Sequence, residues 1–353
     1  MCLWLISPSL FIRATAELSL EESLVFDCDE DGSVSVTCNN LGRILQELNR
    51  LPEAKLYYYR ALKLHYGDRI EEWCSSPKGQ ASCPLAWNSN HLQELSDPTI
   101  QLYSAVWYNL GLIHDKLGCY NKAANAFQVS LGLRRAMLGP NHADVACLLY
   151  NIGVLQMEQQ LLLDATTSFR EALRIRQVSP NSSTNPLSDR HVIQTLKKLA
   201  SLYKAKGNIG GALEVTHEIL NIQKKSSDVE SDLLRNSEIG ATMRDIADLY
   251  HAEGRFALAT KAAEESIDMF RNIQIATAGT IDYVACTEEL VAGLLLLGSI
   301  FHETCRSGMA YELFQEGEAM IRRVLRFFPT SNELNAMKEV TQMLATVHCA
   351  PLA

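Results

Sequence analysis

The residues that could do chemistry are dispersed along this chain of 353 residues. None of the nine histidines shares a helix face with another His or a Cys at metal-ligand spacing. The sequence also lacks a phosphate-binding glycine loop, an HExxH motif and a GxSxG motif in a strand–turn–helix context. Because catalysis needs a base with a partner in reach, we predict that the protein is not an enzyme. Cys74, Cys83 and His91 match no structural zinc spacing, so we expect neither metal nor cofactor.

Composition narrows the classes of partner. The net charge is −9, with 47% apolar and 21% charged residues, which is typical of a mildly acidic globular protein. A broad nucleic-acid surface needs clustered positive charge, and none is seen. The longest apolar run, Leu290–Phe301, is shorter than the roughly 18 residues that cross a bilayer, so we predict no membrane helix.

The cysteines and the N-terminus bear on the compartment. Ten cysteines form no CxxC pair, which predicts small buried side chains in a reducing compartment, the cytoplasm. The segment Met1–Ala16 has an apolar centre but no Lys or Arg before it, and Pro8 interrupts it. We expect a packing segment there, with a cleaved targeting segment as the alternative.

One pattern recurs six times along the chain. A Leu or Ile precedes a small residue, an Ala follows twelve residues later, and an aromatic most often follows four residues after that; the small residues are Gly42, Gly111, Gly153, Ala200, Ala247 and Gly298. Spacings of three and four place apolar side chains on one helix face. Turn signals such as Gly118–Asn121 divide each copy in two. Each copy therefore predicts a helical hairpin, with an aromatic such as Phe127 filling the gap to the next hairpin.

These offsets resemble a known family. Trp107, Leu110–Gly111 and the Ala123-x3-Phe127 pair resemble the tetratricopeptide repeat. The 42-residue step from Gly111 to Gly153, with its linker over residues 138–146, is similar to the kinesin light chain type. Because one hairpin cannot bury its outer stripe, the units must stack. We therefore predict an all-α, right-handed superhelical solenoid of about six hairpins with a C-terminal capping helix.

The predicted organisation has four parts. They are an N-terminal acidic and apolar segment over 1–34, a solenoid over 35–325 with repeats near 35–64, 104–137, 146–177, 193–224, 240–271 and 291–323, an insertion over 67–97, and a capping helix over 330–349.

The resemblance implies that function lies on a concave groove lined by the first helix of each hairpin. Its inward positions, counted from the small residue, carry Asn40, Asn109 and Asn151 in the first three repeats. An amide offers both a donor and acceptors to an extended peptide. Kinesin light chains hold cargo peptides with groove asparagines, which implies this role for Asn109 and Asn151 in particular. Hydrogen bonds between helices are the other interpretation.

Basic residues occupy the groove positions of the next two repeats. Lys197, Lys198 and Lys204 belong to the fourth and Arg244 to the fifth. In an acidic protein this positive centre would favour an acidic or carboxylate-bearing peptide. A solvated Lys-rich face is the other interpretation. The family's clamp for chaperone tails is not reproduced at these positions.

The sequence therefore predicts a cytoplasmic, non-catalytic scaffold or adaptor that binds a protein or peptide partner in its groove, without nucleic acid or membrane. Motor association is not favoured, because residues 14–35 are acidic and show no heptad coiled coil. The alternative is a regulatory sensor whose groove binds a small molecule or nucleic acid. A deep pocket would favour the small molecule, and a continuous basic stripe the nucleic acid.

Overall fold

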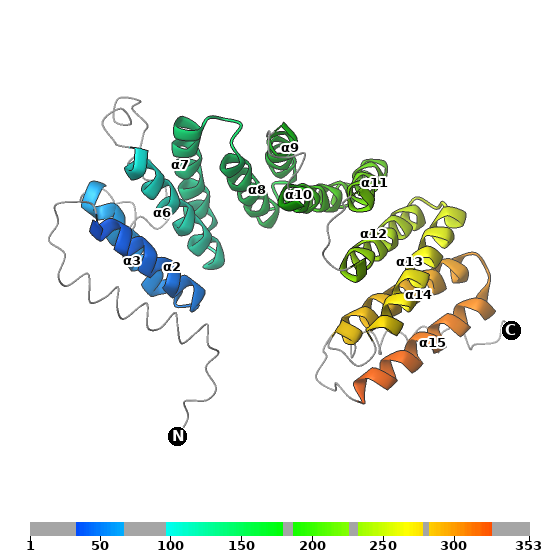
Figure 1. The fold of residues 1–353 in the computed structure, drawn as a ribbon. Helices are drawn as coiled ribbons and strands as arrows, with labels where there is room; N and C mark the ends of the chain where they lie inside the picture. Colours follow the sequence, from blue (N-terminus) through cyan, green and yellow to red (C-terminus); the bar gives the residue numbers. More distant parts are fainter. Residues whose placement is uncertain (1–32, 67–96, 179–185, 226–231, 278–281, 327–353) are drawn as a thin grey trace, which may run out of the picture. The chain divides into compact units, whose positions relative to one another are not determined.

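A computed structural model describes residues 33–66, 97–178, 186–225, 232–277 and 282–326 (Figure 1). These residues form twelve helices and no strand. The first six are α2 (Ser33–Glu47), α3 (Leu51–Tyr66), α6 (Asp97–Lys116), α7 (Tyr120–Leu138), α8 (Ala143–Glu158) and α9 (Leu162–Val178). The others are α10 (Pro186–Ala205), α11 (Ile209–Lys225), α12 (Asp232–Ala252), α13 (Phe256–Ala276), α14 (Asp282–Glu303) and α15 (Ser307–Leu325).

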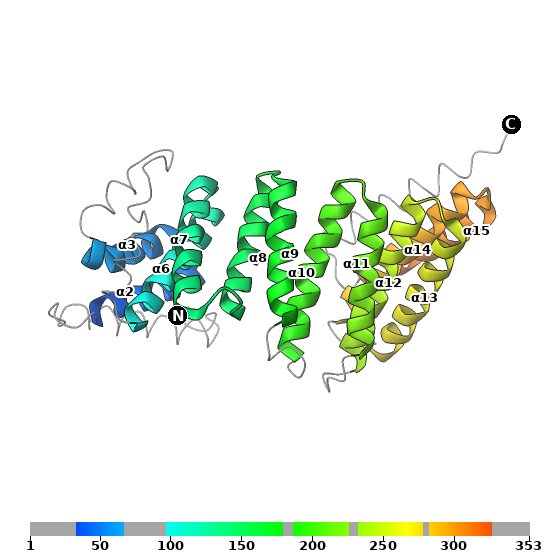
Figure 2. The same cartoon turned by 90° about the horizontal axis from the view of Figure 1, so that it is seen from above.

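Consecutive helices pack in pairs, α2 with α3 through α14 with α15, as Figures 1 and 2 show. The predicted all-α solenoid of helical hairpins is confirmed. Its right-handed superhelical turn stays a prediction. The predicted capping helix, and nearly all of the N-terminal segment and of the insertion, lie outside the described residues.

The chain divides into two compact units, residues 1–180 with α2 to α9 and residues 181–353 with α10 to α15. Unit 1 buries Trp107 completely in a cluster built by α2, α3, α6 and α7. Unit 2 buries Phe270 and Phe314 in a cluster built by α11 to α15. This division into two units does not test the domain boundaries predicted from the sequence, which stay a prediction.

Four hairpins share one close contact between their two helices. The glycine of the first helix lies against the aromatic ring sixteen residues later in the second, in the pairs Gly42–Tyr58, Gly111–Phe127, Gly153–Phe169 and Gly298–Phe314. A Cβ added to Gly153 would lie 2.9 Å from Cε1 of Phe169, so only glycine leaves room for the ring. The Phe127 ring also packs in one cluster with Leu148 and Leu155 of α8. The aromatic therefore joins its own hairpin to the next.

The turns within the hairpins share one backbone conformation. Seven residues after the small residue, φ is positive in every hairpin, at Asn49, Gly118, Gln160, Gly207, Gly254 and Cys305. A left-handed residue at this place ends the first helix and directs the chain back. These turns also expose Cys119 and Cys305, so the expectation of buried cysteines is wrong for these two, although it holds for Cys38 and Cys286.

The helix α14 is more apolar than its longest uninterrupted run suggests. Over Tyr283–Glu303 its length and composition would suffice to cross a membrane, and 56% of its most apolar window is buried within the protein. There Leu290, Leu294 and Leu297 pack in the cluster of unit 2. A helix in a protein core has these same properties.

Candidate functional site

In unit 1, the predicted groove asparagines make hydrogen bonds between first helices. Asn109 of α6 donates from Nδ2 to Oδ1 of Asn39 in α2, at 3.4 Å. Asn151 of α8 donates from Nδ2 to the hydroxyl of Tyr108 in α6, at 2.9 Å. The residue that accepts the bond from Asn109 is thus the buried Asn39, whereas the predicted Asn40 beside it is partly exposed. A role of Asn40, Asn109 and Asn151 in holding a peptide stays a prediction.

Unit 1 also brings together two carboxyl groups that the sequence prediction missed. Asp115 and Glu158 stand in the last turns of α6 and α8. Burial, followed by the charge of Glu158 and a hydrogen bond with it, raises the pKa of Asp115 to about 6. Asp115 comes four residues after Gly111, and Glu158 comes five residues after Gly153. Both offsets are among the predicted inward positions. Applying that rule to acidic residues would have found them.

The neighbouring His114 is buried beside Tyr59 of the preceding hairpin. Its Nε2 lies 2.9 Å from the hydroxyl of Tyr59 in α3, and the residue is 2% exposed. Burial, helped by the charges of Lys122 and Lys55, lowers the pKa of His114 to about 4. The imidazole is therefore neutral at physiological pH and packs between the helices.

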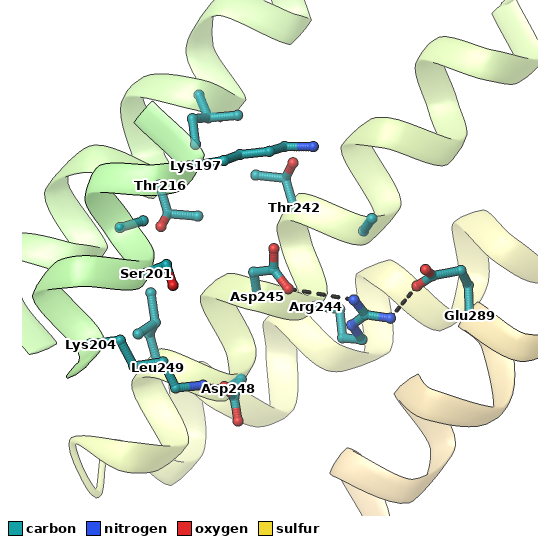
Figure 3. A pocket seen from close by; sticks show the side chains of 13 residues that line it. Lys197, Ser201, Lys204, Thr216, Thr242, Arg244, Asp245, Asp248, Leu249 and Glu289 are labelled. Carbon is teal, nitrogen blue, oxygen red and sulfur yellow. Dashed lines mark hydrogen bonds and ion pairs between the residues drawn. The ribbon is translucent and has the colours of Figure 1, made fainter. Parts of the chain in front are cut away.

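In unit 2, three of the four predicted basic residues line one cavity of about 410 Å³. Lys197 and Lys204 reach it from α10 and Arg244 from α12, while Lys198 is not among its lining residues (Figure 3). Part of the remaining wall comes from α11, with Thr216 and Ile219. The geometry therefore gathers Lys197, Lys204 and Arg244, although their role in peptide binding stays a prediction.

Three carboxylates line the same cavity as the three cations. Lys204 forms an ion pair with Asp248, and Arg244 forms one with Glu289 of α14. A second guanidinium nitrogen of Arg244, Nη2, lies 3.5 Å from Oδ1 of Asp245. The cavity thus holds three cations and three carboxylates and has no net charge. The sequence prediction of a positive centre weighed only the basic residues, although Asp245 and Asp248 also stand at inward positions.

The cavity occupies the place of an apolar cluster in unit 1. Thr216 stands sixteen residues after Ala200, where four of the other five hairpins carry a ring such as Phe127. Thr242 stands five residues before Ala247, as Leu148 stands before Gly153. In unit 1 the corresponding Phe127 and Leu148 belong to one buried cluster. Two threonines in their place leave space and add hydroxyl groups.

No group of three or more side chains able to hold a metal occurs in the residues that the structure describes. Cys74, Cys83 and His91 lie outside them.

Comparisons with known proteins agree with this repeat architecture. Family models of the tetratricopeptide repeat match residues 34–65 and 102–177. No curated protein matches the chain. The predicted resemblance to the tetratricopeptide repeat is confirmed over these residues.

Three solved structures illustrate the likeness. BtubC (BKLC) from P. vanneervenii is 16% identical, with 76% of this chain and 91% of that chain covered and a TM-score of 0.54. The apo form of RapI is 12% identical, with 95% and 87% covered and a TM-score of 0.53. A putative kinesin light chain from Podosopora anserina with nearly identical repeats is 17% identical, with 71% and 100% covered and a TM-score of 0.49. At these identities the likeness concerns the fold alone.

Proposed function

We propose that this protein is a non-catalytic scaffold or adaptor of the cytoplasm that binds a peptide segment of a partner protein along the inward side chains of its first helices. The cavity of unit 2 carries this proposal, because α10, α12 and α14 all present polar and charged side chains to it. Concave surfaces of stacked repeats are where such proteins bind. Asn40, Asn109 and Asn151 would add hydrogen bonds to the peptide in unit 1.

A comparison of captured partners tests the proposal. Lys197 is exposed and lines the cavity, so Lys197→Glu changes the groove without disturbing a core. Lys261→Glu on α13, at a side chain 75% exposed, is the matched control. Both variants and the wild type are used to capture proteins from a lysate, followed by mass spectrometry. We expect Lys197→Glu alone to lose a subset of partners; identical partner sets from all three would contradict binding at the groove.

A second candidate is a regulatory sensor that binds a small molecule in the same cavity. Its volume of about 410 Å³ is what favours this alternative, because ligand pockets typically measure roughly 300 to 1,000 Å³. Thermal-shift screening with a metabolite library would support it if a compound stabilised the wild type but not Lys197→Glu. A nucleic acid has less support, because carboxylates match the cations that line the cavity.

A further inference from the structure

The charge balance of the unit 2 cavity limits what can enter it. Two of its three cations already hold carboxylates, in the pairs Lys204–Asp248 and Arg244–Glu289. A ligand group with a full charge would have to break one of these pairs or face a like charge across the cavity. Both alternatives cost free energy, because a charge removed from water needs a partner. A group without net charge meets neither cost.

Two charged side chains retain bonding capacity. Lys197 forms no ion pair with any residue in the described ranges. Asp245 is 56% exposed, and its contact with Arg244 is long, at 3.5 Å. In Figure 3 the Lys197 ammonium extends over the cavity from α10, and the Asp245 carboxylate points toward the same space from α12. An ammonium only donates hydrogen bonds and a carboxylate only accepts them, so a group between the two must do both.

The hydroxyl groups of the wall are mostly engaged within the protein. Thr216 donates to the carbonyl of Ala212 at 2.8 Å, and Thr242 lies 2.9 Å from Oε1 of Gln223. Ala200, Ile219 and Leu249 supply apolar wall around them. The cavity therefore offers Lys197 as a donor, Asp245 as an acceptor, the hydroxyl group of Ser201 and an apolar lining that can surround the carbon atoms of a side chain.

We propose that this cavity binds a carboxamide side chain, Asn or Gln, of the bound peptide, whose carbonyl accepts from Lys197 while its NH₂ group donates to Asp245. The proposal rests on the proposed function and names the side chain that the groove selects. It replaces the acidic ligand expected from the basic residues alone, because the three carboxylates of the cavity oppose a further anion.

The test uses an array of nonapeptides with random flanking residues and with Gln, Asn, Glu, Asp, Lys or Arg at the centre, probed with the labelled full chain. We expect the wild type to retain carboxamide peptides about tenfold better than charged ones, which is the effect of losing roughly one hydrogen bond to a charged group. Asp245→Asn leaves the cavity one positive charge and should shift the preference to Glu and Asp. Lys197→Met leaves one negative charge and should shift it to Lys and Arg.

Two controls separate the cavity from its surroundings. Lys198→Met changes the neighbouring lysine, which does not line the cavity, and should leave the preference as in the wild type. The double variant Ala200→Gly/Thr216→Phe introduces the glycine and ring that four other hairpins carry, so it should fill the cavity and abolish the preference. Circular dichroism of each variant establishes that its helices are intact.

The outcomes distinguish two failures. If the wild type prefers Glu or Asp, or if the two charge variants leave the preference unchanged, the carboxamide proposal is wrong while peptide binding stands. If the filled variant binds like the wild type, the cavity is not the site. If the wild type retains no nonapeptide at all, the proposed function itself fails.

Discussion

At the scale of single residues, polar contacts join neighbouring first helices within each unit. Asn109–Asn39 and Asn151–Tyr108 link the first helices of unit 1, and ion pairs such as Arg244–Glu289 link those of unit 2. The sequence predicted the inward positions that carry these residues. It could not predict the pairing, because which side chains meet depends on the rotation of adjacent helices and on the lengths of their side chains.

The carboxyl pair of Asp115 and Glu158 gives a prediction for the pH dependence of stability. The folded protein keeps the Asp115 proton up to a pKa of about 6, whereas the unfolded chain releases it near 3.8. Between these values the folded state binds more protons, so this carboxyl group lowers the free energy of unfolding as the pH rises from about 4 to 6. Asp115→Asn replaces the carboxyl group with an amide that does not titrate, so this decrease in the free energy of unfolding does not occur in the variant. We expect the variant to be more stable than the wild type at neutral pH, with the difference shrinking toward pH 4.

Urea denaturation over this pH range measures the difference. Asp268→Asn on α13, at a side chain 74% exposed, is the control, since Asp268 pairs with Arg271 and not with a second carboxyl group. It should show no gain at neutral pH. A difference between Asp115→Asn and the wild type that does not change with pH would contradict the prediction.

At the scale of the hairpin, the glycine and the ring form one unit of packing. Where the small residue is glycine, the residue sixteen positions later is aromatic; where it is Ala200 or Ala247, that residue is Thr216 or Ala263. In the hairpin of α12 and α13, Phe270 instead packs against Gly240, where an added Cβ would lie 2.9 Å from Cε2 of the ring. A large side chain on one helix is thus matched by a small residue on the other. The two helix backbones can approach closely only when one of the two facing residues is small.

This exchange predicts opposite effects for two glycine substitutions. Ring atoms of Phe127 occupy the space that a Cβ at Gly111 needs, so Gly111→Ala should destabilise the protein by about 1–3 kcal/mol through overpacking. Gly210 in α11 has no atom of the described structure near its Cβ position. Gly210→Ala should therefore stabilise by up to about 0.5 kcal/mol, because alanine has the higher helix propensity and Gly210 stands in the first turn of α11.

Thermal and urea denaturation of the two variants measure these changes. Effects of the same sign would contradict the packing explanation, since helix propensity alone favours alanine at both positions.

At the scale of the whole molecule, stability is a sum of local contacts within each unit. Described helices pack mainly against the next helix in the chain, as α6 does with α7 and α7 with α8. In such repeats each hairpin is stabilised by itself and by its neighbours, so damage stays local. The two units have separate clusters of buried residues.

Hydrogen exchange can follow this locality. In Gly111→Ala we expect faster amide exchange in α6, α7 and α8, which lie next to the substitution, and unchanged exchange in α12 to α15. Uniformly faster exchange over all described helices would show that the chain unfolds as one cooperative unit and would contradict the prediction.

The sequence by itself determined the helical hairpins, their number and their turns, because these depend on spacings of three, four and sixteen residues and on local backbone conformation. It also predicted inward positions, of which those of Lys197, Lys204 and Arg244 line the cavity of unit 2. Only the tertiary structure decided that carboxylates from α12 and α14 neutralise the basic residues, since Glu289 comes from the next hairpin. Only the packing of α10, α11 and α12 left a cavity at Thr216, because a void depends on how large and small side chains from separate helices meet.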